Sequence, residues 1–126
     1  MANYYYINPN PKGLHTRDCV IRAFAFFFGS TWREAFMDLI NWCAERGLVD
    51  FNYRSVYNEY LKDKGYHRHS CPEKGMTVSQ FMTDFADDNA VYIVSCKQRH
   101  LTIVHNKDVL DTFDCRQMTV DGYWRK

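Results

Sequence analysis

Three residues of this chain have the types and the order that a cysteine hydrolase needs. Cys19 opens an apolar run that extends to Phe28, and His100 and Asp111 follow far downstream. Such an enzyme needs a thiolate that attacks a carbonyl, a base that takes the thiol proton, and an acid that orients the base. A cysteine early in the chain with a later histidine and carboxylate therefore predicts nucleophilic chemistry through a thioester.

The apolar run predicts a buried helix over residues 18–28, which Gly29 ends. The thiol of Cys19 then lies at a helix N-terminus, where partial positive charge lowers a thiol pKa and favours the thiolate. Asp18 is expected to cap this helix. Arg22 lies one turn beyond Cys19 on the same side, where it can form an ion pair or bind an acidic group of a substrate.

The base and the acid are expected on neighbouring strands. His100 begins a predicted strand over residues 100–105. A turn of two or three residues would return the chain as a second strand over 109–113, which brings Asp111 alongside the histidine. Asp114, three residues after Asp111, is the competing candidate for the acid that orients the histidine.

The rest of the pattern places helices before strands. Helical spacing and capping-box signals predict helices over 32–46, 54–64 and 78–87, and alternation predicts further strands over 66–71, 90–96 and 120–124. Residues 1–15 are predicted to be irregular, although Tyr4–Tyr6 can form an edge strand or line a substrate groove. We therefore expect one α+β domain over 1–126, with N-terminal helices packed on a C-terminal antiparallel sheet.

Composition excludes several classes of function. The chain has 126 residues and a net charge of +1, which argues against a nucleic-acid partner bound through bulk charge. No apolar run approaches the ~18–20 residues of a membrane span. The N-terminus shows no signal-peptide pattern, and the five cysteines are an odd number, so we expect reduced thiols, a cytoplasmic location and no membrane partner. Nothing in the composition indicates a cofactor.

Two segments carry a resemblance to a known family. Asp18–Phe24, followed by Trp32, resembles the nucleophile helix of small papain-like cysteine hydrolases. The segments His100–Val104 and Asp111–Asp114 resemble their histidine strand and the acid strand that follows it. The chain is most similar to small proteins of this type from bacteriophages and bacteria. It resembles more distantly the peptidase domains of bacteriocin-exporting transporters, in which an Asp-Cys pair opens the helix.

The resemblance implies a papain-like peptidase or amidase with Cys19 as nucleophile, acting on a peptide or protein substrate. It implies the host cytoplasm as location if the chain is phage-encoded, and it makes Trp32, like Arg22, a candidate for contact with the substrate. Papain-like enzymes often place a glutamine about six residues before the nucleophile, where it helps to bind the oxyanion. Asn8, Asn10 or the backbone N–H of Cys19 can supply that donor here, because the position holds a glycine, Gly13.

Two other functions stay open at this point. The missing glutamine favours a papain-like binding module without turnover, such as a phage protein that inhibits a host factor. Separately, His67, His69 and Cys71 alternate along a predicted strand and can hold zinc. No second ligand pair of recognisable spacing follows them, so our leading interpretation includes no metal. Cys115 comes directly after Asp114 and can lie close to the site.

Overall fold

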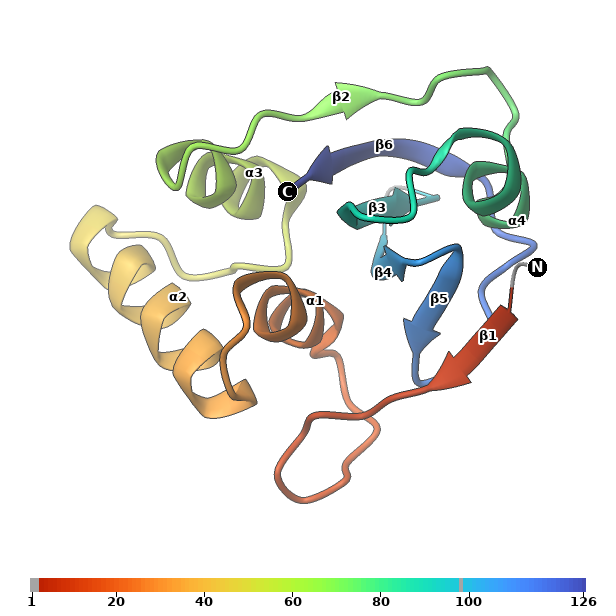
Figure 1. The fold of residues 1–126 in the computed structure, drawn as a ribbon. Helices are drawn as coiled ribbons and strands as arrows, with labels where there is room; N and C mark the ends of the chain where they lie inside the picture. The colour runs from red at the N-terminus through yellow and green to blue at the C-terminus, as the bar shows by residue number, and fades with distance from the viewer. Residues whose placement is uncertain (1–2, 98) are drawn as a thin grey trace.

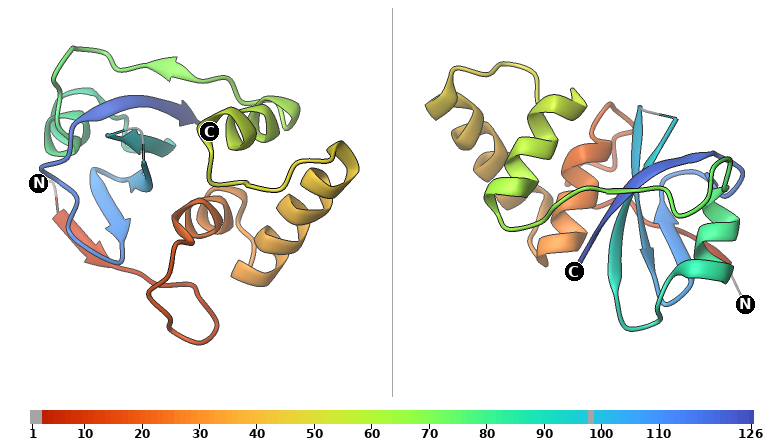
Figure 2. Two further views of the ribbon diagram at one scale, coloured as in Figure 1. Left: turned by 180° about the vertical axis from the view of Figure 1, so that it is seen from behind. Right: turned by 90° about the horizontal axis from the view of Figure 1, so that it is seen from above.

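The strands form one mixed sheet, and helices cover both of its sides. The computed structural model describes residues 3–97 and 99–126. Helices α1 (Cys19–Phe28), α2 (Trp32–Arg46) and α3 (Arg54–Asp63) lie on one side of the sheet (Figure 1). The short helix α4 (Val78–Gln80) and the π-helix η1 (Phe81–Phe85) lie on the other side (Figure 2, right). The α+β class is therefore confirmed. None of the helices in the described ranges is long and apolar enough to cross a bilayer.

The sheet has six strands, and its topology differs from the predicted antiparallel meander. In spatial order the strands are β1 (Asn3–Tyr6), β5 (Asp108–Asp111), β4 (His100–His105), β3 (Val91–Cys96), β6 (Val120–Arg125) and β2 (His69–Ser70). Strands β3, β4 and β5 form the expected meander, but β6 returns to the far side of β3.

Strand β1 lies at the edge of the sheet, as one alternative for Tyr4–Tyr6 predicted, whereas residues 1–15 as a whole were predicted to be irregular. Strand β1 runs parallel to β5, with Tyr4 opposite Val109 and Tyr6 opposite Asp111. The side chain of Tyr4 packs against the core beneath the sheet, whereas Tyr6 is exposed. The prediction of an antiparallel sheet is thus wrong at this edge, because the pairing joins segments about a hundred residues apart and leaves no local signal.

Both faces of the central strands are buried. Ile93 of β3 and Leu101 and Ile103 of β4 belong to the core shared with α1, α2 and α3. Tyr92 and Val104 belong to a second core beneath α4 and η1. Leu101 and Ile103 share a face, as the alternation of β4 predicted. This two-sided packing holds the strand that carries His100.

Helix α1 lies at the centre of the first core because its sequence is apolar on nearly every side. Its buried residues include Ile21, Phe24 and Phe27. Gly29 ends the helix with φ of 65°, in the left-handed region that glycine adopts at low cost, as predicted. The helix packs against β4, which brings the first turn of α1 close to the first residues of that strand.

Both predicted capping boxes form, but the last helix is shorter than expected. Thr31 opens α2 and Thr77 opens α4, each accepting a hydrogen bond from the backbone three residues on. The helix predicted over 78–87 instead continues as a single π-type turn, closed by a 2.9 Å bond from the N–H of Ala86. The Nζ of Lys107 donates to the carbonyl of Ala86 at 2.9 Å, in place of the backbone N–H that a longer helix would have offered to that carbonyl.

Candidate active site

The base and the acid meet at one end of the β4–β5 hairpin. Asn106 and Lys107 form its turn, with φ values of 53° and 61°, and Ile103 pairs with Leu110 across the strands. Antiparallel pairing therefore brings the start of β4 next to the end of β5.

His100 contacts the carboxylate that the sequence favoured. Its Nε2 lies 2.6 Å from Oδ2 of Asp111. The alternative acid, Asp114, lies at the surface and binds Arg116, with 2.7 Å between Oδ2 and Nη2. Asp111 is thus the partner of the imidazole, and Asp114 belongs to a separate ion pair.

Cys19 is the first residue of α1 and is half-buried against the start of β4. Its thiol lies close enough to the side chain of His100 and the backbone of Leu101 for both to lower its pKa. Because Nε2 of the imidazole contacts Asp111, Nδ1 is the ring nitrogen available to the thiol. The three residues therefore form one continuous chain of contacts, in the order nucleophile, base and acid.

This chain of contacts favours the charged form of each member. Burial raises the pKa of the Cys19 thiol, but hydrogen bonding and the charges of His100 and Arg22 outweigh burial and lower it overall. Burial lowers the pKa of His100, but hydrogen bonds to Asp111, Cys115 and Cys19 outweigh that effect and raise it to about 11. The arrangement therefore favours a thiolate beside an imidazolium at neutral pH.

Asp18 and Arg22 connect the first turn of α1 to the acid. Arg22 forms an ion pair with Asp18, and its Nη2 lies 3.3 Å from Oδ1 of Asp111. Asp18 also accepts hydrogen bonds from Nε1 of Trp32 at 2.8 Å and Nδ2 of Asn10 at 3.3 Å. Arg22 thus forms the ion pair expected as one of its two roles, and Trp32 is held inside the same network.

The predicted capping role of Asp18 is not observed. Asp18 occupies the N-cap position, but its side chain makes no cap hydrogen bond because Arg22, Trp32 and Asn10 take its oxygens. The N–H groups at the start of α1, including that of Cys19, therefore have no side-chain cap.

The two asparagines proposed as oxyanion donors shape the loop before α1. Nδ2 of Asn8 donates to the carbonyl of Leu14 at 3.0 Å, and Nδ2 of Asn10 donates to Asp18. Both amide groups are thus engaged within the protein. The third candidate, the backbone N–H of Cys19, has no side-chain cap and is the donor that fits best.

Two further side chains near the catalytic group were only partly anticipated. Cys115 is 1% exposed, and its Sγ lies 3.5 Å from Oδ2 of Asp111. The ring of Phe113 lies 4.8 Å from that of His100, measured between centroids. Their closeness to Asp111 in the sequence was the only signal for either residue, and it did not show whether their side chains would face the site.

Tyr4 is a contact that the sequence did not indicate at all. Its hydroxyl donates to the backbone carbonyl of Asp111 at 3.2 Å, and the N–H of Ile7 donates to the same oxygen at 2.9 Å. Strand β1 thereby holds the end of β5 in place. No local pattern could have revealed this, because it depends on the parallel pairing.

One group of possible metal ligands lies within the described residues, and it overlaps the site. Ligand atoms of His100, Asp111 and Cys115 all lie within 4.8 Å of one another. Their types suit zinc, but the carboxylate is already shared by the imidazole and Arg22.

The zinc ligands considered from the sequence are not brought together. The ring of His69 stacks on Tyr123, with 5.0 Å between centroids, and Sγ of Cys71 lies 3.0 Å from the carbonyl of Glu73. In the described ranges, the group of possible ligands is the one around His100.

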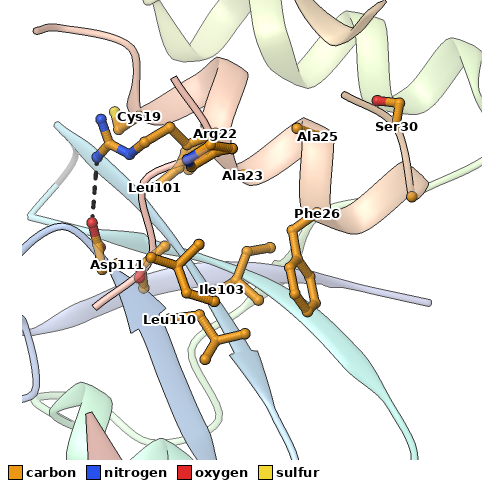
Figure 3. A pocket seen from close by; sticks show the side chains of 14 residues that line it. Cys19, Arg22, Ala23, Ala25, Phe26, Ser30, Leu101, Ile103, Leu110 and Asp111 are labelled. Atoms are coloured by element: carbon orange, nitrogen blue, oxygen red, sulfur yellow. Dashed lines mark hydrogen bonds and ion pairs between the residues drawn. The ribbon is translucent and has the colours of Figure 1, made fainter. Parts of the chain in front are cut away.

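Cys19 lies where two pockets meet. One is a groove of about 300 Å³ that runs along α1 toward Phe26 and is lined mainly by apolar side chains (Figure 3). The other is wider, about 950 Å³, and is lined by polar and charged residues that include Arg17, Arg99 and His100. A bond presented to Cys19 would therefore have an apolar environment on one side and a polar one on the other.

Comparisons with known proteins identify no family. No protein-family model, curated protein or solved structure matches the chain. The α+β class and the contacts around Cys19 are therefore the basis for any functional assignment, and the papain-like fold stays a prediction.

Proposed function

We propose that this protein is a cysteine-dependent hydrolase of the peptidase or amidase class, with a papain-like arrangement of its catalytic groups. The observation that carries the proposal is the chain of contacts from Cys19 through His100 to Asp111, with 2.6 Å between Nε2 and Oδ2. The order of these residues and the helix and strand types that hold them support the same assignment.

The first half of the reaction uses the charged pair. The thiolate of Cys19 attacks the carbonyl carbon of an amide, forming a carbon–sulfur bond and a tetrahedral oxyanion. The imidazolium of His100 then donates its proton to the departing nitrogen, the carbon–nitrogen bond breaks, and an amine leaves. Asp111 holds the imidazole in orientation throughout and stabilises its charge.

The second half releases the acyl group. Water attacks the thioester while His100 takes one of its protons, and the collapse of the second tetrahedral species releases the acid and the Cys19 sulfur. The backbone N–H of Cys19, at the positive end of α1, is the proposed donor to the oxyanion in both halves.

The proposed substrate is a peptide or protein, and the proposed location is the cytoplasm. The wide polar pocket beside Cys19 has room for a segment of chain, since small-molecule sites already begin at about 300 Å³. All five cysteines are free thiols, which fits a reducing compartment.

Alkylation of individual cysteines tests the nucleophile without knowledge of the substrate. We expect iodoacetamide to modify Cys19 at least roughly tenfold faster than Cys71 at pH 7, with a midpoint below the ordinary thiol value of ~8.5. Cys71 is the internal reference because it is also half-exposed but has no contact with His100. Peptide mass spectrometry at each pH measures both rates in the same sample.

A pair of histidine variants separates the base from general effects. His100→Gln should slow the alkylation of Cys19 at pH 7, because the thiolate loses its charged partner. His105→Gln, at the opposite end of β4, should leave the rate unchanged. If Cys19 reacts no faster than Cys71 in the unmodified protein, the hydrolase proposal fails, and the alternative of a binding module that inhibits a host protein takes its place.

A further inference from the structure

The groove beside α1 continues directly from the thiol of Cys19. Apolar side chains from three parts of the chain line it: Ile7 before the helix, Phe26 on α1, and Leu101, Ile103 and Leu110 on β4 and β5. Figure 3 shows Cys19 and Arg22 at one end and Phe26 toward the other. Phe26 is 37% exposed, although most of α1 is buried, so the groove opens at the protein surface.

The charged side chains of the groove are already paired within the protein. Among the described residues that line it, the charged side chains are Arg22 and Asp111, which pair with each other at 3.3 Å. Arg22 also binds Asp18, and Asp111 also binds His100, so both charges are satisfied within the protein. An apolar group would bury surface there without leaving a charge unpaired.

Size limits the group that fits. The volume of about 300 Å³ corresponds to roughly ten water-sized or methylene-sized groups at ~30 Å³ each. The helix that forms one wall advances ~1.5 Å per residue, so the groove extends for roughly 15 Å between the residues Cys19 and Gly29 that line its ends. A single unbranched chain or one long side chain matches both the volume and the length.

We infer that this groove binds the acyl side of the substrate, and that the group it takes is apolar and about six to ten carbons long. The inference rests on the proposed function, because it places the scissile carbonyl at Cys19. When the carbon–sulfur bond forms and the amine departs with the proton from His100, the acyl part stays in the groove as a thioester. The amine leaves through the wide polar pocket that also borders Cys19.

Three alkylating agents of the same reactivity test the groove. Iodoacetamide has no tail, N-hexyl iodoacetamide has an apolar tail, and a third reagent has an ether chain of the same length. The rate at Cys19 should rise at least about tenfold with the hexyl tail, because several methylenes enter the groove. The ether chain should give little gain. Equal rates for the hexyl and ether reagents would overturn the inference.

Two tryptophan variants show whether the gain comes from this groove. Leu110→Trp fills it, and the ratio of the hexyl rate to the iodoacetamide rate should fall toward one. Val49→Trp adds the same side chain at a position that is 98% exposed and borders neither pocket, so the ratio should persist. A ratio that stays high in Leu110→Trp would contradict the assignment.

A binding experiment separates the groove from the chemistry of the thiol. In Cys19→Ala, octanamide should shift the methyl resonances of Ile103 and Leu110, whereas a polar amide of equal length should not. Absence of these shifts at the solubility limit of octanamide would overturn the groove assignment, even if Leu110→Trp does not fold. If alkylation of Cys19 is slow and does not depend on the reagent's tail, but octanamide still binds, the proposed role of Cys19 as nucleophile would be rejected and the groove assignment would stand.

Discussion

The imidazole of His100 lies between a carboxylate and a thiol, and its protonation couples the two. Asp111 is buried, and its negative charge would be costly without the imidazolium and Arg22 beside it. The imidazolium in turn stabilises the thiolate of Cys19. The reactivity of the cysteine therefore depends on an aspartate that does not touch it.

Asp111→Asn tests this coupling. The neutral amide removes the charge that raises the pKa of His100, so the imidazolium is lost at lower pH and the thiolate loses its partner. We expect the midpoint of Cys19 alkylation to rise by at least about one pH unit, and the rate at pH 6 to fall roughly tenfold. A pH series with iodoacetamide measures both.

Asp114→Asn is the matched control for that substitution. It changes the same side chain three residues away, where the carboxylate binds Arg116 at the surface and does not contact His100. The pH profile of Cys19 should be unaffected. Equal profiles for the two variants would show that Asp111 does not act through the imidazole.

At the scale of the elements, one aspartate joins the loop before α1, the helix itself and α2. Asp18 accepts from Asn10 in the loop, Arg22 in α1 and Trp32 in α2. This use of its carboxylate oxygens explains why Asp18, at the N-cap position, makes no side-chain cap for the helix. The first turn of α1, with Cys19, is held in place by these links.

Asp18→Ala should therefore destabilise the protein strongly. The substitution leaves the buried guanidinium of Arg22 with one partner fewer and the indole of Trp32 without an acceptor, and breaking a buried ion pair costs about 3–5 kcal/mol. Urea unfolding measures the free energy. Asp63→Ala is the control, because Asp63 also accepts from an indole and an arginine.

The contrast between these two aspartates is burial. The side chain of Asp63 is 54% exposed, against 5% for Asp18. Exposed ion pairs contribute about 0–1 kcal/mol, so the control should lose little stability. Similar losses in both variants would mean that burial of the network around Asp18 contributes nothing.

For the molecule as a whole, the site places a buried carboxylate at the end of β5, next to edge strand β1. Burial raises the pKa of Asp111, but the hydrogen bond and charge of His100 outweigh burial and lower it overall. A folded-state pKa below the unfolded value contributes stability above pH ~4, and that stability is lost as the pH falls through the folded pKa. The active site should therefore contribute to sensitivity toward acid.

Urea unfolding at pH 5, 3 and 2 tests this expectation. The free energy of unfolding should fall more steeply with decreasing pH in the unmodified protein than in Asp111→Asn, which has no carboxylate to protonate at that position. Other carboxylates with lowered pKa, such as Asp38 beside Tyr60, are present in both proteins and cancel in the comparison. Parallel pH dependences would contradict the expectation.

Sequence alone determined the features that depend on neighbouring residues. The apolar run and Gly29 fixed the bounds of α1, the capping box at Thr31 fixed the start of α2, and strand spacing placed Asp111 beside His100 across a short turn. Each of these follows from backbone geometry over a few residues, which side-chain type controls directly.

Only the tertiary structure decided the features that join distant segments. The parallel pairing of β1 with β5, the return of β6 to β3, and the use of Asp18 to join α1 and α2 have no local signature. They depend on which surfaces remain to be buried once the hairpin and the helices have formed. The same reason explains why the sequence named Cys19, His100 and Asp111 but gave no sign of the apolar groove that begins beside them.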